Sequence, residues 1–418
     1  MQKLLYTLNL IFITQITVAQ SDLPSGFLSQ IGQTDSLYSK ALDEYRELFI
    51  QLPEGYDPED SVQYPVVYIL DGEVLLPTVA LVQSYYSGGF TPEMILVGIS
   101  NARNRTRDLT PTKVRELHGQ DFWDSTGEAE QFSVFIEQDL FPYIESKYSV
   151  SPYKTLIGHS YAGLFTLYTF LENPDLFNNY IAIDPSLDWD AQVLLKNLDT
   201  KLKGQDYNSQ ALFMSLSGQL NMQDQEVTIE NVMEDESPMS LFARSNIEFS
   251  NRVKAHADTG LSYTWKFYEN DLHGTVPFPS IHDGLIACFE WYQMENTYAI
   301  NNPETSVDSL RSIIAYRAQK LKRQFGYFVP PYPEDLLNIS GYMNMDFGQM
   351  DKAKMYFDFA IQYYPKSPNL YDSMADFYER NADYKSALDH VKKAFALDNQ
   401  SRYAERIEEL KAKIDEDK

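Results

Sequence analysis

Short continuous apolar runs alternate with helically spaced apolar positions along the first three quarters of the chain. Residues 65–70 and 94–99 form such runs, which are typical of strands buried on both faces of a parallel sheet. Residues 132–148 instead place large apolar side chains three and four positions apart, as in a helix that packs on such a sheet. This alternation predicts a doubly wound α/β domain over residues 20–300, with its site at the carboxyl ends of the strands.

Beyond residue 300 the strand-like runs stop. Residues 301–333 contain a basic helical stretch and a proline-rich segment, and we predict that they form a linker. In residues 334–418, small or bulky residues recur 34 positions apart, in the pairs Leu337 and Tyr371, Gly341 and Ala375, Gly348 and Ala382, Ala353 and Ala387, and Ala360 and Ala394. Small residues recur where paired helices approach closely, and this period is that of a helix-turn-helix repeat. We predict an all-α segment of two tetratricopeptide-like repeats with a capping helix, a segment suited to binding a protein partner.

The N-terminus has the features of a secretory signal peptide. Lys3 precedes a mostly apolar stretch, and the residues Thr17, Val18 and Ala19 resemble a cleavage site. We therefore expect residues 1–19 to be removed from an exported protein, periplasmic or secreted, with no membrane span after cleavage. An uncleaved N-terminal anchor is the alternative.

The charge and the cysteine content exclude several classes of partner and site. The net charge is −26, from 60 acidic and 34 basic residues, which disfavours nucleic acid and anionic membrane surfaces as partners. Cys288 is the one cysteine, so the chain can build neither an intramolecular disulfide nor a thiolate metal site. The histidine spacing also indicates no metal cluster, and we expect no cofactor.

The strongest candidate for chemistry is the segment 158–163, with the sequence GHSYAG. It follows a short apolar strand and precedes an apolar helix, which is the arrangement of a nucleophile elbow. Such a turn exposes the serine hydroxyl and requires small residues on both sides of Ser160, here Gly158 and Ala162. A tight turn with a purely structural role is the competing interpretation.

A serine hydroxyl is a poor nucleophile until a base removes its proton. His273 follows the last predicted strand, where this type of fold delivers its base, and His282 is the reserve candidate. The third member of a triad should be a carboxylate after the preceding strand, and Asp224 and Glu226 are the candidates there. A dyad without a strong acid is the alternative.

Two backbone N–H groups are needed to stabilise the oxyanion of an acyl-transfer reaction. Tyr161 supplies one, directly after the nucleophile, and the loop at Gly72 and Glu73 should supply the other. Three arginines lie between residues 103 and 107 after the strand that ends at residue 99. Arg107 is a candidate for binding an anionic ester, and its ion pairing with Asp108 is the structural alternative.

Five segments, taken in order, form a recognisable set. They are residues 71–72 (DG), 105–111 (RTRDLTP), 158–163 (GHSYAG), 184–186 (DPS) and 273–277 (HGTVP). Together they resemble the family of putative esterases related to esterase D, which includes enterobactin-type siderophore esterases, feruloyl and acetylxylan esterases and S-formylglutathione hydrolase. The resemblance covers about residues 48–298.

This resemblance implies a serine carboxylesterase on an α/β-hydrolase fold without a metal cofactor, with Ser160 as nucleophile and His273 as base. The family's oxyanion loops match Gly72, Glu73 and Tyr161. The chain departs from the family at three positions, because Ala162 replaces a usual glycine, Asp184 stands where serine is common, and Asn221 falls near the expected acid. Some siderophore esterases of this group look like Ser–His dyads.

The sequence thus predicts a serine carboxylic ester hydrolase that acts through an acyl-enzyme on a small-molecule ester. A siderophore lactone, an acyl sugar or a phenolic ester fits this chemistry. Two alternatives remain: an acyltransferase that uses the same serine and histidine, and a degenerate hydrolase scaffold that binds a protein partner through its helical repeats.

Overall fold

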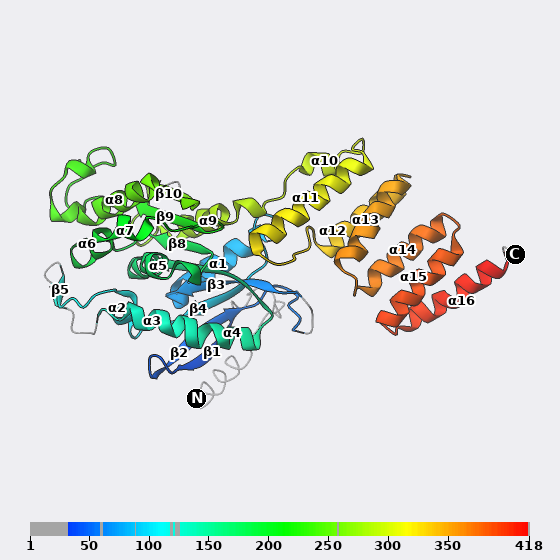
Figure 1. The fold of residues 1–418 in the computed structure, drawn as a ribbon, viewed down its shortest axis with the longest axis horizontal. Coiled ribbons are helices and arrows are strands. Elements are labelled where there is room, and N and C mark those ends of the chain that lie inside the picture. Colours follow the sequence, from blue (N-terminus) through cyan, green and yellow to red (C-terminus); the bar gives the residue numbers. More distant parts are fainter. Residues whose placement is uncertain are drawn as a thin grey trace, which may run out of the picture.

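The computed structural model describes residues 32–416, apart from 59–61, 88, 118–119, 122–125 and 257–258 (Figure 1). The predicted signal peptide lies outside these residues. Among the described helices, none combines the length and the apolar character that crossing a membrane requires.

An eight-stranded mixed sheet forms the centre of the α/β part, in the order β1-β2-β4-β3-β7-β8-β9-β10. The six strands from β4 to β10 in this order are parallel, and β1 and β2 are added antiparallel at one edge. The strand bounds are β1 (Gln33–Ser39), β2 (Glu44–Gln51), β3 (Tyr64–Leu70), β4 (Ile95–Ile99), β7 (Val150–His159), β8 (Asn179–Ile183), β9 (Ala211–Ser217) and β10 (Ser262–Tyr268). The predicted α/β fold is confirmed, while β1 was not predicted because its sequence, QTDSLYS, is mostly polar.

Helices cover both faces of the sheet, and each face has its own buried apolar cluster (Figure 1). One face is covered by α3 (Ala129–Phe135), the π-helix Ile136–Leu140, α4 (Phe141–Lys147), α5 (Tyr161–Glu172), α6 (Trp189–Lys196), α7 (Leu198–Leu202) and α8 (Leu241–Ala255). The other face is covered by α1 (Gly72–Tyr86) and α9 (Pro277–Cys288). Cys288 is buried on this second face, and burial raises the pKa of its thiol, as expected of a structural cysteine.

Smaller elements complete the α/β part: the helix α2 (Arg105–Leu109) and a hairpin of β5 (Glu116–Leu117) and β6 (Gln120–Asp121). Four 3₁₀ turns lie in the described connections, at Pro174–Leu176, Val232–Glu234, Pro238–Ser240 and Glu290–Tyr292.

The predicted linker is largely a helix that packs into two cores. The stretch contains part of α10 (Thr297–Asn301) and all of α11 (Val307–Phe325). Leu321 and Phe325 join the apolar cluster on the second face of the sheet, whereas Leu310 and Ile314 pack with residues of the C-terminal helices. The helix α11 therefore packs against both the α/β part and the C-terminal helices.

The C-terminal part consists of antiparallel helices that follow one another (Figure 1). They are α12 (Glu334–Asp346), α13 (Met350–Tyr363), α14 (Pro368–Arg380), α15 (Tyr384–Leu397) and α16 (Ser401–Glu416). The bounds of α12 and α13 recur 34 residues later in α14 and α15, as residues 334 and 350 correspond to residues 368 and 384. At one predicted contact, a Cβ added to Gly341 would lie 2.4 Å from the ring of Phe357, so only glycine fits between these helices.

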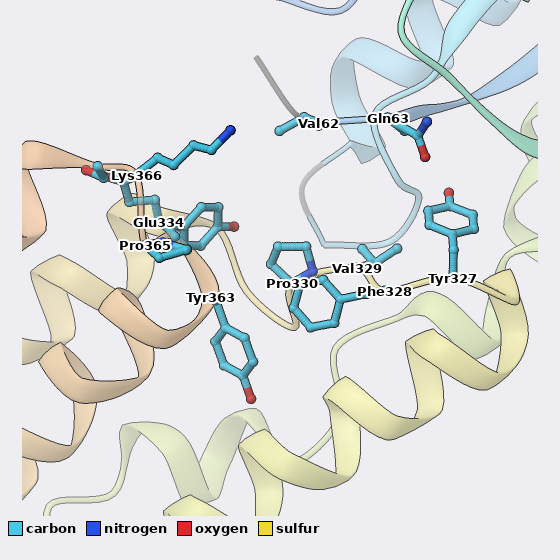
Figure 2. Close-up of a pocket in the computed structure, with 12 residues that line it drawn as sticks. Val62, Gln63, Tyr327, Phe328, Val329, Pro330, Glu334, Tyr363, Pro365 and Lys366 are labelled. Atoms are coloured by element: carbon cyan, nitrogen blue, oxygen red, sulfur yellow. The ribbon is translucent and has the colours of Figure 1, made fainter. Parts of the chain in front are cut away.

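A cavity of about 620 Å³ lies where the α/β part meets the C-terminal helices (Figure 2). The segment after α11 contributes Phe328 and Pro330, α13 contributes Tyr363, and Gln63 approaches from the start of β3. The rings of Phe328 and Tyr363 stack with their centroids 6.1 Å apart.

Candidate active site

The predicted nucleophile sits at a sharp turn between a strand and a helix. Ser160 follows β7 and precedes α5, and its φ of 61° and ψ of −118° lie outside the ordinary regions for a residue with a side chain. A Cβ added to Gly158 would lie 2.2 Å from the carbonyl oxygen of Ala162, so the turn cannot close without this glycine. Ala162 itself is fully buried against the sheet. The local geometry is that of a nucleophile elbow.

His273 lies in the loop after β10, and its ring is held by a carboxylate. Its Nδ1 is 2.7 Å from Oδ2 of Asp184, whose side chain is fully buried. The other oxygen, Oδ1 of Asp184, accepts a hydrogen bond from the backbone N–H of Ser217 at 2.9 Å. The imidazole is therefore oriented by a carboxylate that is itself fixed by the backbone.

The two acids expected from the sequence lie elsewhere. Asp224 accepts a hydrogen bond from the backbone N–H of Glu226, and both residues are exposed in the loop after β9. Asp184 instead follows β8, the strand next to the nucleophile strand. The sequence predicts the acid in the loop after the strand that precedes the histidine, and there Asp184 stands only as a departure from a family serine.

The hydroxyl and the imidazole lie at the same edge of the sheet. The N–H of Ser160 donates to the carbonyl of Ile183, which directly precedes Asp184. The Oγ of Ser160 is 3.3 Å from Oγ of Ser186, and within the described part of the chain no hydrogen bond joins it to His273. Catalytic hydrogen bonds often form only in the complex with substrate, so a Ser–His pair does not require this hydrogen bond in the free protein.

Two helices begin at the residues predicted to form the oxyanion hole. The helix α1 starts at Gly72 and α5 starts at Tyr161, and neither helix receives a side-chain hydrogen bond from the residue that precedes it. The first N–H groups of a helix have no partner within that helix and carry a partial positive charge. A Cβ added to Gly72 would lie 2.5 Å from Cα of Gly98, which explains glycine at this position.

Glu73, the other residue predicted for this loop, points its carboxyl toward backbone N–H groups. Burial raises the pKa of the Glu73 carboxyl, while the N–H groups of Glu73 and Asn101 oppose that rise.

Arg107, which we considered as a substrate-binding residue, is engaged in ion pairs. Its guanidinium binds Glu44 at 2.7 Å and Asp108 at 2.8 Å, and its side chain is only 16% exposed. Asp108 is fully buried and also pairs with Arg46. Arg107 is therefore held in ion pairs, which was the alternative to substrate binding. The arginine that reaches the candidate site is Arg105.

Arg105 contacts both sides of the candidate oxyanion hole. Its Nε lies 3.0 Å from both carboxylate oxygens of Asp71, and its Nη2 lies 2.9 Å from Oδ2. The same Nη2 donates to the carbonyl of His159 at 3.2 Å. Its guanidinium carbon also lies 5.4 Å from the ring centre of Tyr161.

A second histidine packs on the base. The rings of His159 and His273 lie 4.6 Å apart, and Nε2 of His159 is buried without a hydrogen-bond partner. Burial and the neighbouring His273 lower the pKa of His159 to about 4. Together with Asp184, these histidines present three potential metal ligands within 4.8 Å of one another, a proximity that sequence spacing did not indicate. The hydrogen bond between Asp184 and His273 already uses two of these groups.

The reserve histidine, His282, lies on α9 with both ring nitrogens occupied. Its Nδ1 is 2.7 Å from Asp283 and its Nε2 is 2.8 Å from the hydroxyl of Tyr86. This geometry leaves His273 as the candidate base.

A cavity of about 430 Å³ opens beside His273. Its walls are largely apolar and come mainly from the loop after β9 and the start of α8, while Asp188, Ser217 and Gln219 add polar groups. The lining includes Met222, Pro238, Met239 and Phe242. The ring of Phe242 stands perpendicular to that of His273, with the centroids 5.5 Å apart. An apolar group of a bound molecule would fit here, next to the candidate base.

The fold and this arrangement define an α/β-hydrolase-like domain with a Ser–His–Asp constellation. Residues 39–246 match the family described as Putative esterase. This match agrees with the resemblance inferred from the motifs of the α/β part.

Curated relatives share part of this region. The chain is 34% identical over 174 residues to the ferri-bacillibactin esterase BesA of Bacillus subtilis, covering 38% of this chain and 60% of that protein. It is 31% identical over 145 residues to the siderophore triacetylfusarinine C esterase of Aspergillus fumigatus, covering 31% of this chain and 47% of that protein. The matches therefore span about half to three fifths of these relatives.

Solved structures extend the similarity. An IroE-like serine hydrolase from Shewanella oneidensis is 28% identical with a TM-score of 0.63, covering 79% of this chain and 99% of that one. An uncharacterised protein from Capnocytophaga ochracea is 20% identical with a TM-score of 0.57, covering 91% of this chain and 99% of that one. The second likeness shows the fold alone.

Proposed function

We propose that this protein is a serine carboxylic ester hydrolase with Ser160 as nucleophile, His273 as base and Asp184 as the acid of the triad. The observation that carries the proposal is the 2.7 Å hydrogen bond between Asp184 and His273 beside a strained serine turn. A buried carboxylate that fixes an imidazole near a serine is the arrangement that activates a hydroxyl for acyl transfer.

In the proposed reaction, Oγ of Ser160 exchanges its contact with Ser186 for one with Nε2 of His273. The hydroxyl attacks the ester carbonyl while His273 takes its proton, and the Asp184 carboxylate stabilises the imidazolium that forms. The N–H groups of Tyr161 and Gly72 bind the oxyanion, and the N–H of Glu73 joins them only once the Glu73 carboxyl, which it faces in the structure, turns away. His273 then protonates the leaving alcohol, and water releases the acyl group by the reverse sequence of proton transfers.

The substrate class follows from the cavity and from the relatives. The apolar cavity beside His273 suits an aryl or alkyl group rather than a bare sugar. The two curated relatives described above are named as a ferri-bacillibactin esterase and a siderophore triacetylfusarinine C esterase. We therefore place a siderophore lactone first among the three candidate substrates, with a phenolic ester second and an acyl sugar third.

Labelling with a fluorophosphonate tests the nucleophile directly. The purified protein should acquire one phosphonyl group on Ser160, and Ser160→Ala should acquire none. A panel of a siderophore trilactone, a feruloyl ester, an acetylated sugar and p-nitrophenyl esters then ranks the substrates. Absence of labelling, with no hydrolysis of any ester in the panel, would refute the proposal and leave a binding scaffold.

We also propose that α12 to α15 form two tetratricopeptide-like repeats capped by α16, and that residues 1–19 are removed on export. The first inference is supported by the recurrence of helix bounds after 34 residues and by the close contact at Gly341. The second is supported by the sequence alone. Mass measurement of the exported protein tests the cleavage site, since a mature chain should begin at Gln20.

A further inference from the structure

Arg105 holds a carboxylate that would otherwise stand beside the candidate oxyanion hole. Asp71 directly precedes Gly72 at the start of α1, and its backbone carbonyl accepts the N–H groups of Val74 and Leu75. Aspartate at this position usually uses its side chain to accept the first N–H groups of the helix. Here the side chain makes no such bond, because both of its oxygens lie 3.0 Å from Nε of Arg105.

The same guanidinium reaches the nucleophile side of the site. Its Nη2 donates to the carbonyl of His159, one residue before Ser160. One side chain thus contacts Asp71, directly before Gly72 at the start of α1, and His159, two residues before Tyr161 at the start of α5. Arg105 comes from α2, a separate element, so it links the two helix starts from outside.

We infer that Arg105 is a positioning residue for the oxyanion hole, which it keeps open by drawing the Asp71 carboxylate away from the first N–H groups of α1 while fixing the elbow through His159. This inference rests on the proposed function. It assigns to the arginine a role in the rate of the chemical step rather than in the binding of a charged substrate.

Electrostatics explains why the carboxylate matters. An oxyanion hole works because its donors are preorganised and unoccupied when negative charge develops on the substrate oxygen. Without Arg105, the charge of an unpaired Asp71 carboxylate beside Gly72 would repel the developing oxyanion. The Asp71 side chain is only 11% exposed, so water screens this charge weakly.

Kinetics of variants on a neutral ester, p-nitrophenyl butyrate, test the inference. Arg105→Met should lower kcat about 10²-fold, the effect of losing one oxyanion donor, with KM changed less than about twofold. The double variant Arg105→Met with Asp71→Asn should recover at least about tenfold of that loss. Asparagine also tolerates the left-handed backbone of residue 71, whose φ is 49°, so this second change preserves the turn.

Two further variants separate charge from position. Arg103→Met removes an exposed arginine two residues away, in a cavity formed with Tyr45 and Glu47, and should leave the rate unchanged. Arg105→Lys keeps a positive charge for Asp71 but lacks the fork that also reaches His159, and it should give an intermediate kcat. Thermal unfolding of each variant checks that the fold is retained.

Three outcomes would overturn the inference. They are a parental kcat in Arg105→Met, a loss confined to KM, and a double variant no faster than the single one. Fluorophosphonate labelling separates this failure from that of the proposed function. If the parent is labelled at Ser160 and Arg105→Met is labelled at the same rate, the hydrolase proposal stands and the role of Arg105 falls. If the parent is not labelled, both fall.

Discussion

Replacing Asp184 with asparagine removes the charge that faces His273 while keeping the size of the side chain. Nδ1 of His273 is 2.7 Å from the carboxylate, and Asp184 is fully buried while the His273 side chain is 39% exposed, so solvent screens the pair only in part. Taking a separation of about 4 Å between the charge centres and an effective dielectric constant of about 20, the imidazolium gains about 4 kcal/mol from this carboxylate. Loss of that energy in the transition state corresponds to about a 10³-fold lower kcat.

The assay is the steady-state hydrolysis of a p-nitrophenyl ester by Asp184→Asn and the parent. We expect the loss to appear in kcat with little change in KM, because the imidazolium forms only during the reaction. The asparagine side-chain oxygen can still accept the N–H of Ser217, so the variant should fold, which thermal unfolding verifies.

Matched controls come from the acids first expected from the sequence. Asp224→Asn and Glu226→Gln change exposed loop residues and should retain the parental kcat. Parental activity in a folded Asp184→Asn variant, or a large loss in either control, would refute the assignment of the triad acid.

Three more predictions concern the same region. Folding lowers the pKa of His159 from 6.5 to about 4, so the unfolded chain binds a proton at a higher pH than the folded chain does. The free energy of unfolding should therefore drop by about 3 kcal/mol as the pH falls from 6.5 to 4. Chemical denaturation of His159→Gln should show a shallower pH dependence than the parent, and an unchanged slope would contradict the burial of this histidine. Gly158→Ala places a methyl group 2.2 Å from the carbonyl of Ala162, so labelling at Ser160 should be lost or the protein should unfold at lower temperature, whereas a parental result in both would mean that the turn has another geometry. Phe242→Ala enlarges the cavity beside the base and should raise KM for an aryl ester more than for an acetyl ester, which parallel kinetics would check.

Most of the fold could be predicted because buried parallel strands leave continuous apolar runs. The runs at residues 65–70 and 94–99 became β3 and β4, within one residue of the expected bounds. The edge strand β1 was missed because an exposed edge needs few apolar residues. The sequence of α11 is basic overall and predicts part of a linker, because its two small groups of apolar residues enter separate cores and form no single apolar stripe.

The part of the candidate site that could be predicted is the turn at the serine, because its backbone geometry restricts the neighbouring residue types. A serine between small residues, after a strand, requires a strained turn, and the structure has that turn at Ser160. The acid was not found because the choice among carboxylates depends on which strand end faces the imidazole. Asp184 carried one usable signal, its place directly after a buried strand in the segment 184–186, beside the strand of the nucleophile.

The sequence also could not show which of two arginines lies at the candidate site. Arg105 and Arg107 lie two positions apart in one short helix, and such residues project in different directions. Arg107 turns to Glu44 and Asp108, while Arg105 turns to Asp71. Only the packing of α2 determines which of them reaches the site.

The role of Ser160 as nucleophile is tested most directly by locating the residue that is acylated during turnover. Rapid quenching of the protein with p-nitrophenyl acetate, followed by peptide mass spectrometry, locates any acetyl group that the protein carries. A mechanism with Ser160 as nucleophile predicts a burst of p-nitrophenol of up to one equivalent and an acetyl group on Ser160. Steady hydrolysis with no acetyl group on Ser160, or with the acetyl group on another residue, would contradict it.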